Sequence, residues 1–457
     1  MSRSLSLSLA RVPVALRRLP PGRAGARTLL HAAPPCLAAA TLLAFGYQRY
    51  AWGTAHAQEY QQQAYAHLRY SDIIWLYLRD HLATHPVPYL DYRLEYPVLL
   101  GFWMYLLSFT GSLSAFFAAN YALLAAGALL TVLLLGLLAG ADRWRLALAP
   151  ALVLYTGLNW DMAAIAATVV GLVLVQRRRD RPGTLALTIA VWLKLFPLVF
   201  LAAVLWERLR RRELRRSAEI AAIFAGVSLL LNLPLALADW SRWSYFFTFN
   251  NDRAGNANLW VLWPHLAVDR GNLISLGLLA AGGVVLAALA WRARLDVTLP
   301  LGAGLLVWWL AVNKIFSPQY ALWVFLAMAL VRAAWPLWAA FAAADLAHFG
   351  LSWLLLYTAS VAGNTGLVRW ENHHLRDPVV LALGALMLVL VVECALRLWR
   401  GRGEDSCEQP GVKRVARWVR GRWRVDRRSD KAPGAADQQR LAAESKEAFR
   451  ARAGAGG

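Results

Sequence analysis

The sequence predicts an all-α protein that crosses a membrane several times, and three observations support this prediction. Of its 457 residues, 59% are hydrophobic and only 16% are charged. Apolar stretches long enough to span a bilayer of about 30 Å recur along the chain. The net charge of +21 is concentrated in short blocks at the ends of these stretches. That placement is typical of the positive-inside rule rather than of a phosphate-binding face for nucleic acid.

The N-terminal part of the chain predicts a basic arm and a first span. Residues 1–28 are rich in arginine and are expected in the cytoplasm, with the first span over residues 29–49. The same pattern, followed by Ala55-His56-Ala57, is also typical of a cleaved signal peptide. We favour an uncleaved span, because further apolar stretches follow. Residues 50–95 would then form the first large outside loop.

The next apolar region predicts one short segment and one crossing. Residues 96–110 are too short for a comfortable span and are expected to be interfacial or re-entrant. Residues 114–140 then cross inward. This assignment returns Arg143 and Arg145 to the cytoplasm, as the positive-inside rule requires.

Two stretches have arginines at both ends and therefore cannot be single spans. Residues 145–176 are interrupted by Asn159-Trp160-Asp161, and residues 183–206 are interrupted by Lys194 and Pro197. Each is expected to be a hairpin of two short helices with its polar interruption at the outward tip. Helices of about 12–16 residues do not cross a full bilayer. The tips should therefore lie in a protein-lined or wet depression, where charge is shielded from lipid.

The remainder of the chain completes a membrane domain over residues 29–398. About twelve helices are expected, with both termini in the cytoplasm. The tail, residues 399–457, is basic and expected to be disordered, with contacts to anionic lipid headgroups. The remaining predicted elements are a span at 217–238, a second large outside loop at 239–271, a span at 272–291, a third hairpin of 297–312 and 317–332 with Asn313-Lys314 at its tip, and spans at 334–357 and 378–398 around an outside loop containing residues 369–377.

The first outside loop contains the leading candidate for chemistry. Asp72 precedes an amphipathic helical run, so it is either an N-cap acceptor for that helix or a general base held at the membrane surface. Tyr70 and Tyr96 accompany it in the same loop. Asp91 and Glu95 are interpreted as solvated loop carboxylates, with substrate contact as the alternative.

Lysines within the apolar hairpins require partners. Lys194 in an apolar span costs several kcal/mol unless it meets a counter-charge or water. A lipid-linked phosphate is one candidate partner, and Asp161 of the neighbouring hairpin is the other. Asp161 could instead cap the second short helix. Lys314 allows the same argument, with snorkelling to the outer interface as its alternative.

The second outside loop combines aromatic residues with amides and charge. Arg253 follows Asn250-Asn251-Asp252, and several tryptophans surround this run. Sugar and phosphate recognition requires such groups, although an interfacial aromatic belt also explains the tryptophans. The belt does not explain the density of Asn, Asp and Arg. His348 lies within a predicted span, and either packs between helices or reaches the same cavity.

Several of these motifs together resemble glycosyltransferase family 87, the polyprenyl-phosphate-mannose-dependent α-(1→2) mannosyltransferases of the C-type membrane glycosyltransferase superfamily. The resemblance covers about residues 65–395 and rests on the order and common outward placement of the motifs. Val98 stands where the family often has a second proline. The motifs are Tyr70-Ser71-Asp72-Ile73, Pro88-Tyr89, Glu95-Tyr96-Pro97, Asn159-Trp160-Asp161, Lys194-Leu195-Phe196-Pro197 and Phe316-Ser317-Pro318-Gln319-Tyr320.

The resemblance implies a C-type glycosyltransferase fold that transfers a hexose, with mannose as the expected sugar, with inversion. The donor would be a polyprenyl-phosphate sugar, and the acceptor a glycolipid or glycan hydroxyl at the outer face of the cell membrane. Asp72 matches the family's acidic base, and its phosphate-binding cations correspond to Lys194, Arg253 or Lys314. The alternatives are a transporter or flippase of a lipid-linked or polar solute, and a non-catalytic scaffold.

The sequence contains no recognisable cofactor motif. Its three cysteines, Cys36, Cys394 and Cys407, have neither metal-site nor disulfide-framework spacing. It also contains no Gly-rich phosphate loop of the kind used by nucleotide-sugar enzymes. We therefore expect no metal, no cofactor and no nucleic-acid partner.

Overall fold

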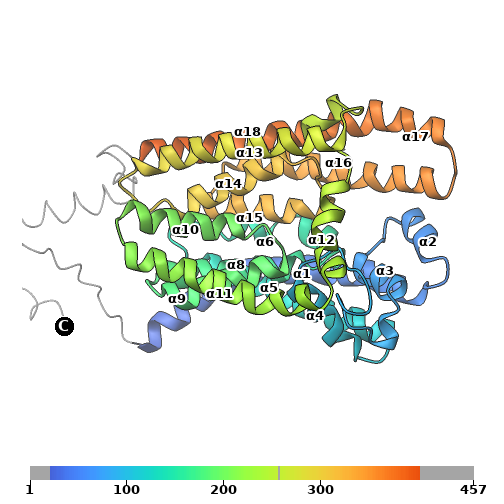
Figure 1. Ribbon diagram of the computed structural model, residues 1–457, viewed down its shortest axis with the longest axis horizontal. Coiled ribbons are helices and arrows are strands. Elements are labelled where there is room, and N and C mark those ends of the chain that lie inside the picture. The colour runs from blue at the N-terminus through green and yellow to red at the C-terminus, as the bar shows by residue number, and fades with distance from the viewer. Residues whose placement is uncertain (1–20, 256–257, 402–457) are drawn as a thin grey trace, which may run out of the picture. The chain divides into compact units, whose positions relative to one another are not determined.

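The structure is a computed structural model that describes residues 21–255 and 258–401, and this part of the chain is helical without a β-strand (Figure 1). The predicted all-α class is therefore confirmed. Within these residues, five helices are long and apolar enough to cross a membrane. They are α5 (Leu113–Leu135), α11 (Leu214–Ala238), α13 (Val268–Trp291), α16 (Trp335–Ser360) and the continuous helix Thr365–Arg400.

The N-terminal helix starts earlier than predicted. α1 (Pro21–Ala51) covers the expected first span and the last residues of the expected arm. It contains Pro34 and Pro35 and is not among the five long apolar helices. The rest of the arm and the tail beyond Gly401, with Cys407, lie outside the described residues.

All three predicted hairpins are present, although their arms are less regular than expected. The first consists of α6 (Trp144–Ala147) and α7 (Ala151–Tyr155), which meet at Pro150, and the returning α8 (Asp161–Gln176). The second is α9 (Asp180–Leu193) with α10 (Leu198–Arg210). The third is α14 (Thr298–Val312) with η4 (Pro318–Tyr320) and α15 (Ala321–Val331). The described part of the chain contains eighteen α-helical segments, more than the expected dozen. The first hairpin arm is divided at Pro150, a π turn divides the last helix, and the two large predicted loops contain helices of their own.

Contacts at the bases of the hairpins join the two ends of the second hairpin and link neighbouring hairpins. Arg208 Nη2 lies 2.8 Å from Asp180 Oδ1, so the first and last turns of the second hairpin are joined. The backbone N–H of Asp142 donates to the carbonyl of Ala329 at 2.8 Å, which joins the first hairpin to the third. α8 and α9 also pack closely, because a Cβ on Gly183 would lie 3.0 Å from the carbonyl oxygen of Gly171.

The prediction of an outside loop around residues 369–377 is wrong, because the chain is helical there. α17 (Thr365–Glu371), the π-helical segment η5 (Asn372–Arg376) and α18 (Asp377–Arg400) follow without a break. The side chain of Asn364 caps α17 by accepting from Leu367 N at 2.9 Å. The π turn lies just before Pro378, whose ring is incompatible with a regular α-helical turn.

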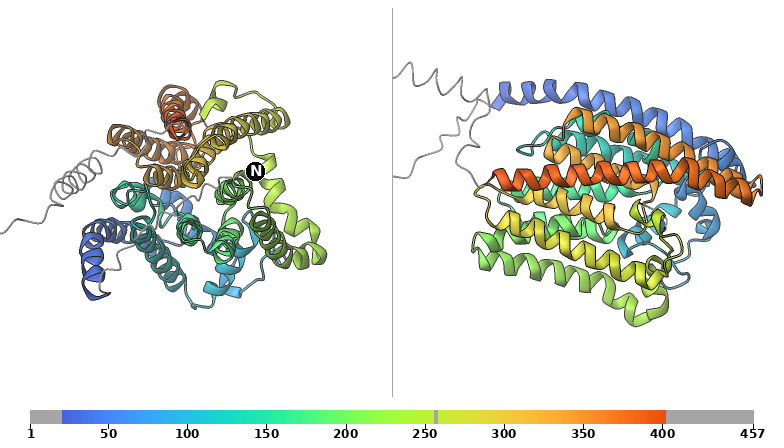
Figure 2. Two further views of the ribbon diagram at one scale, coloured as in Figure 1. Left: turned by 90° about the vertical axis from the view of Figure 1, so that its left-hand side faces the viewer. Right: turned by 90° about the horizontal axis from the view of Figure 1, so that it is seen from above.

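The two large predicted loops are folded and meet at one end of the bundle (Figures 1 and 2). Arg242 of the second loop donates to the carbonyl of Leu90 in the first. The Asp72 N–H donates to the carbonyl of Leu158 at the tip of the first hairpin, at 2.8 Å. The loops and the hairpin tips therefore share one end, as predicted. Their helices are η1 (Trp52–Ala55), α2 (Tyr60–Ala66), α3 (Asp72–Arg79), η2 (Leu82–Thr84), α12 (Trp240–Asp252) and η3 (Asn258–Leu262). The short α4 (Val98–Ser108) follows the first loop and corresponds to the short segment predicted at residues 96–110.

Candidate functional site

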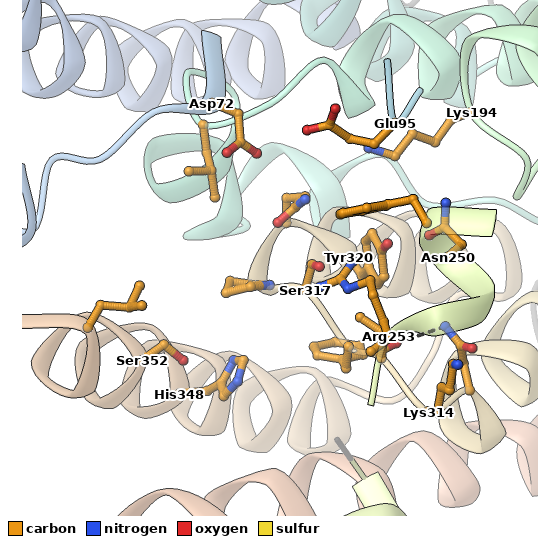
Figure 3. Close-up of a pocket in the computed structure, with 18 of the residues that line it drawn as sticks. Asp72, Glu95, Lys194, Asn250, Arg253, Lys314, Ser317, Tyr320, His348 and Ser352 are labelled. Carbon is orange, nitrogen blue, oxygen red and sulfur yellow. Dashed lines mark hydrogen bonds between the residues drawn. The ribbon is translucent and has the colours of Figure 1, made fainter. Parts of the chain in front are cut away.

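A cavity of about 770 Å³ lies where the loops, the hairpin tips and α16 meet (Figure 3). Of the ten residues selected from the sequence, two do not line it, Asp91 and Asp161. The eight that line it are Tyr70, Asp72, Glu95, Tyr96, Lys194, Arg253, Lys314 and His348. Residues from six separate segments of the chain are thus brought to one site.

Asp72 does not act as the helix cap that one interpretation assigned to it. Ser71 occupies the N-cap position of α3, and Asp72 is the first helical residue. The Asp72 carboxylate instead accepts a hydrogen bond from Asn159 Nδ2 at 2.7 Å. The hydroxyl of Ser71 donates to the carbonyl of Gly157 at 2.6 Å, which fixes the start of α3 to the tip of the first hairpin. The carboxylate is consequently directed toward the cavity instead of its own helix.

The surroundings of Asp72 favour a carboxylate that can take up a proton. Burial raises the pKa of Asp72 above its usual value of 3.8. Hydrogen bonds from Asn159 and Tyr70, and the charge of Lys194, act in the opposite direction. A base with a raised pKa is better matched to proton transfer near neutral pH.

Lys194 has the internal partner that one of the two hypotheses named. Its Nζ lies 3.0 Å from Asp161 Oδ2, and Asp161 is completely buried. The second oxygen of Asp161 accepts from Trp323 Nε1 at 2.7 Å. Lys194 Nζ also lies 5.2 Å from the centre of the Tyr96 ring. Its charge is therefore largely balanced by Asp161.

Two other cations face the cavity from its opposite side. Lys314, at the tip of the third hairpin, is 5% exposed and donates to the carbonyl of Asn251 in α12 at 2.6 Å. It is therefore buried against α12 instead of snorkelling away from the bundle. Arg253 follows α12 and packs against the Phe249 ring at 5.6 Å. Among the described residues, neither Lys314 nor Arg253 forms an ion pair with a carboxylate.

The remaining candidates have distinct environments. Glu95 is held by Arg79 through two contacts of 2.6 and 2.9 Å, so its charge is compensated although it lines the cavity. Asp91 accepts from the N–H of Val87 at 2.7 Å within its own loop, as its loop interpretation requires. His348 lies across the cavity from Asp72, with its ring 5.9 Å from that of Phe316.

Sequence reasoning missed several residues of this site. Asn159 was recognised only as part of a hairpin tip, although it joins Asp72 to Lys194. Val368, Asn372 and Arg376 line the cavity at intervals of four. Only this helical spacing could have indicated them, and the region was expected to be a loop. Other missed lining residues are Ser317, Tyr320 and Ser352.

Neither a metal centre nor a related protein identifies this site. In residues 21–255 and 258–401, no group of three or more His, Cys, Asp or Glu side chains is placed to hold a metal ion. Comparison with known protein families, curated proteins and solved structures found no match for this chain. The site is therefore interpreted from its own geometry.

Proposed function

We propose that this chain is a membrane glycosyltransferase of the polyprenyl-phosphate-sugar-dependent class. It would move a hexose, with mannose as the expected sugar, to a hydroxyl of a cell-envelope glycolipid or glycan. The observation that carries this proposal is a single cavity with a carboxylate on one side and two cations on the other. These groups are Asp72 and the pair of Arg253 and Lys314.

The chemistry needs a base and a phosphate site, and these residues can supply both. Asp72 takes the proton from the acceptor hydroxyl, whose oxygen attacks the anomeric carbon of the donor. The bond from that carbon to the phosphate oxygen breaks in the same displacement, which inverts the configuration. The lipid phosphate leaves with its negative charge stabilised by Arg253 and Lys314. Lys194 is the weaker phosphate candidate, because Asp161 already balances its charge.

The walls of the cavity suit a sugar. Aromatic side chains from three hairpin segments line it and offer flat apolar faces to a hexose ring. Phe196 packs edge-on against Trp309 at 5.2 Å and against Tyr320 at 4.8 Å between ring centres. Interlocked rings of this kind form a rigid surface, which favours one orientation of the bound sugar.

The proposed orientation places the cavity at the outer face of the cell membrane. The arginine-rich turns at residues 177–181 and 208–216 lie at the hairpin bases, whereas the cavity lies at the tips. By the positive-inside rule, the bases would face the cytoplasm. A polyprenyl-phosphate sugar and its acceptor would then meet within the outer leaflet.

The decisive experiment replaces Asp72 and compares cell-envelope glycolipids by mass spectrometry. Cells that carry Asp72→Asn in place of the native chain should lack a hexose, while the variant is still inserted in the membrane. Asp91→Asn is a matched control, because Asp91 belongs to the same loop but lies outside the cavity. Full transfer by Asp72→Asn would refute the proposal. Solute flux in vesicles without glycosylated product would favour a transporter instead.

A further inference from the structure

Asn159 forms hydrogen bonds through every donor and acceptor position of its side chain. Nδ2 donates to Asp72 Oδ2 at 2.7 Å and to the Tyr96 hydroxyl at 2.8 Å. Oδ1 accepts from Lys194 Nζ at 3.2 Å and from the N–H of Trp160 at 2.7 Å. The residue is completely buried at the tip of the first hairpin. One amide thus connects three of the residues that line the cavity.

The chemistry of these partners fixes the orientation of the amide. Lys194 Nζ and the Trp160 N–H can only donate, so the oxygen of Asn159 must face them. The NH₂ group must then face Asp72 and Tyr96. An N–H donor favours the charged form of a carboxyl group over the neutral form. Asn159 therefore stabilises Asp72 as a carboxylate, the form that can accept a proton.

We infer that Asn159 is a positioning residue that holds Asp72 in its proton-accepting form and couples it to Lys194 and Tyr96. This inference rests on the proposed function, since it concerns the base of that reaction. The Asn159 amide occupies Asp72 Oδ2, and Tyr70 also donates a hydrogen bond to the carboxylate. Because the two oxygens of a carboxylate together offer about four acceptor positions, a position remains for an acceptor hydroxyl.

The same contact gives Tyr96 a defined role. Its hydroxyl accepts from Asn159, so its own proton is available to donate. Because Tyr96 lines the cavity, that proton is available to a substrate oxygen. Asn159 thus orients two neighbouring polar groups, Asp72 as a proton acceptor and Tyr96 as a proton donor.

The test measures transfer from polyprenyl-phosphate [¹⁴C]mannose into glycolipids of native membranes, as a function of pH. Asn159→Ala removes the donor to Asp72, and Asn159→Asp adds a second negative charge beside it. Both changes raise the pKa of Asp72. The acid limb of the kcat profile, where kcat falls as the pH is lowered, should therefore move to higher pH by about one unit or more. We expect kcat at neutral pH to fall at least about tenfold, which is part of the roughly 10²–10⁴-fold that general-base catalysis contributes, with KM for the donor less affected. Asn159→Ser, which keeps a shorter donor, should restore part of the loss.

Asn120 provides the matched control. It is equally buried and accepts from Trp160 Nε1 at 2.6 Å, but it makes no hydrogen bond to Asp72. Asn120→Asp should therefore lower thermal stability without moving the acid limb.

Three outcomes would overturn the inference. The Asn159 variants could lose activity with an unmoved acid limb, or Asn120→Asp could move the limb equally. The third is that every Asn159 variant fails to accumulate as folded protein while Asn120→Asp accumulates, which would assign Asn159 to the fold alone. Failure of the proposed function is distinguishable from all three, because it would appear as full transfer by Asp72→Asn.

Discussion

Breaking the buried ion pair between Lys194 and Asp161 should strongly destabilise the protein, and Lys194→Met tests this directly. The two charges lie 3.0 Å apart between neighbouring hairpins, with Asp161 completely buried and Lys194 9% exposed. Methionine keeps the length of the side chain but removes the ammonium group. Asp161 would then remain as an uncompensated charge in the interior.

The size of the effect follows from that isolated charge. Removing one partner of a buried pair costs about 3–5 kcal/mol. Lys194→Met also removes a donor from Asn159 Oδ1, which places the expected loss toward the upper part of this range. The double variant Lys194→Met/Asp161→Asn removes both charges and keeps an acceptor for Trp323 Nε1. It should recover a substantial part of the lost stability.

The assay is the free energy of unfolding in detergent micelles, measured by denaturant titration and arranged as a double-mutant cycle. Arg181→Met is the control, because Arg181 pairs with Glu219 on the surface, where ion pairs contribute little. The reasoning is refuted if Lys194→Met costs no more than Arg181→Met. It is equally refuted if the double variant is no more stable than the single one.

Three further predictions concern the packing of the first large loop against α4 and the cavity itself. In Gly101→Ala, the new Cβ would lie 2.4 Å from the Tyr89 hydroxyl oxygen. Thermal unfolding should therefore show a loss of stability of about 1–3 kcal/mol. An unchanged Tm would contradict this packing. Because the pKa of Asp72 is raised above 3.8, transfer activity should disappear as pH falls through that raised value, and a profile still flat at 3.8 would exclude Asp72 as the base. Arg253→Met and Lys314→Met should each lower kcat/KM for the lipid-linked donor by about tenfold or more, because both cations stabilise the departing phosphate. Steady-state kinetics with an unaltered kcat/KM would remove them from the phosphate site.

The hairpins could be predicted because they depend only on where arginines and apolar stretches lie along the sequence. Arginines at both ends of an apolar stretch force its two ends to the same side, whatever the helices later contact. The structure confirms this at the Arg208–Asp180 pair, which joins the ends of the second hairpin. The common placement of the hairpin tips and the two large loops followed from the same argument.

The hydrogen-bond network of the site could not be predicted, because it joins residues that are far apart in the sequence. Burying the charged Lys194 in an apolar span costs several kcal/mol, and this cost identified it as a candidate. Asn159 carries no charge, so the same argument did not identify it. Its contacts to Asp72 and Tyr96 span separations of 87 and 63 residues. Likewise, the polar run at residues 369–377 suggested a loop, whereas local capping by Asn364 and a π turn keep it helical.

The returning arms of the three hairpins have an electrostatic consequence of their own. α8, α10 and α15 begin at Asp161, Leu198 and Ala321, so all three start at the end of the bundle that contains the cavity. Aligned peptide dipoles give the start of a helix a partial charge of about +0.5. The backbone thus creates a positive potential around the cavity that does not titrate and that no side-chain substitution removes. An anion entering the cavity would be attracted by this field even in a variant that lacks both Arg253 and Lys314.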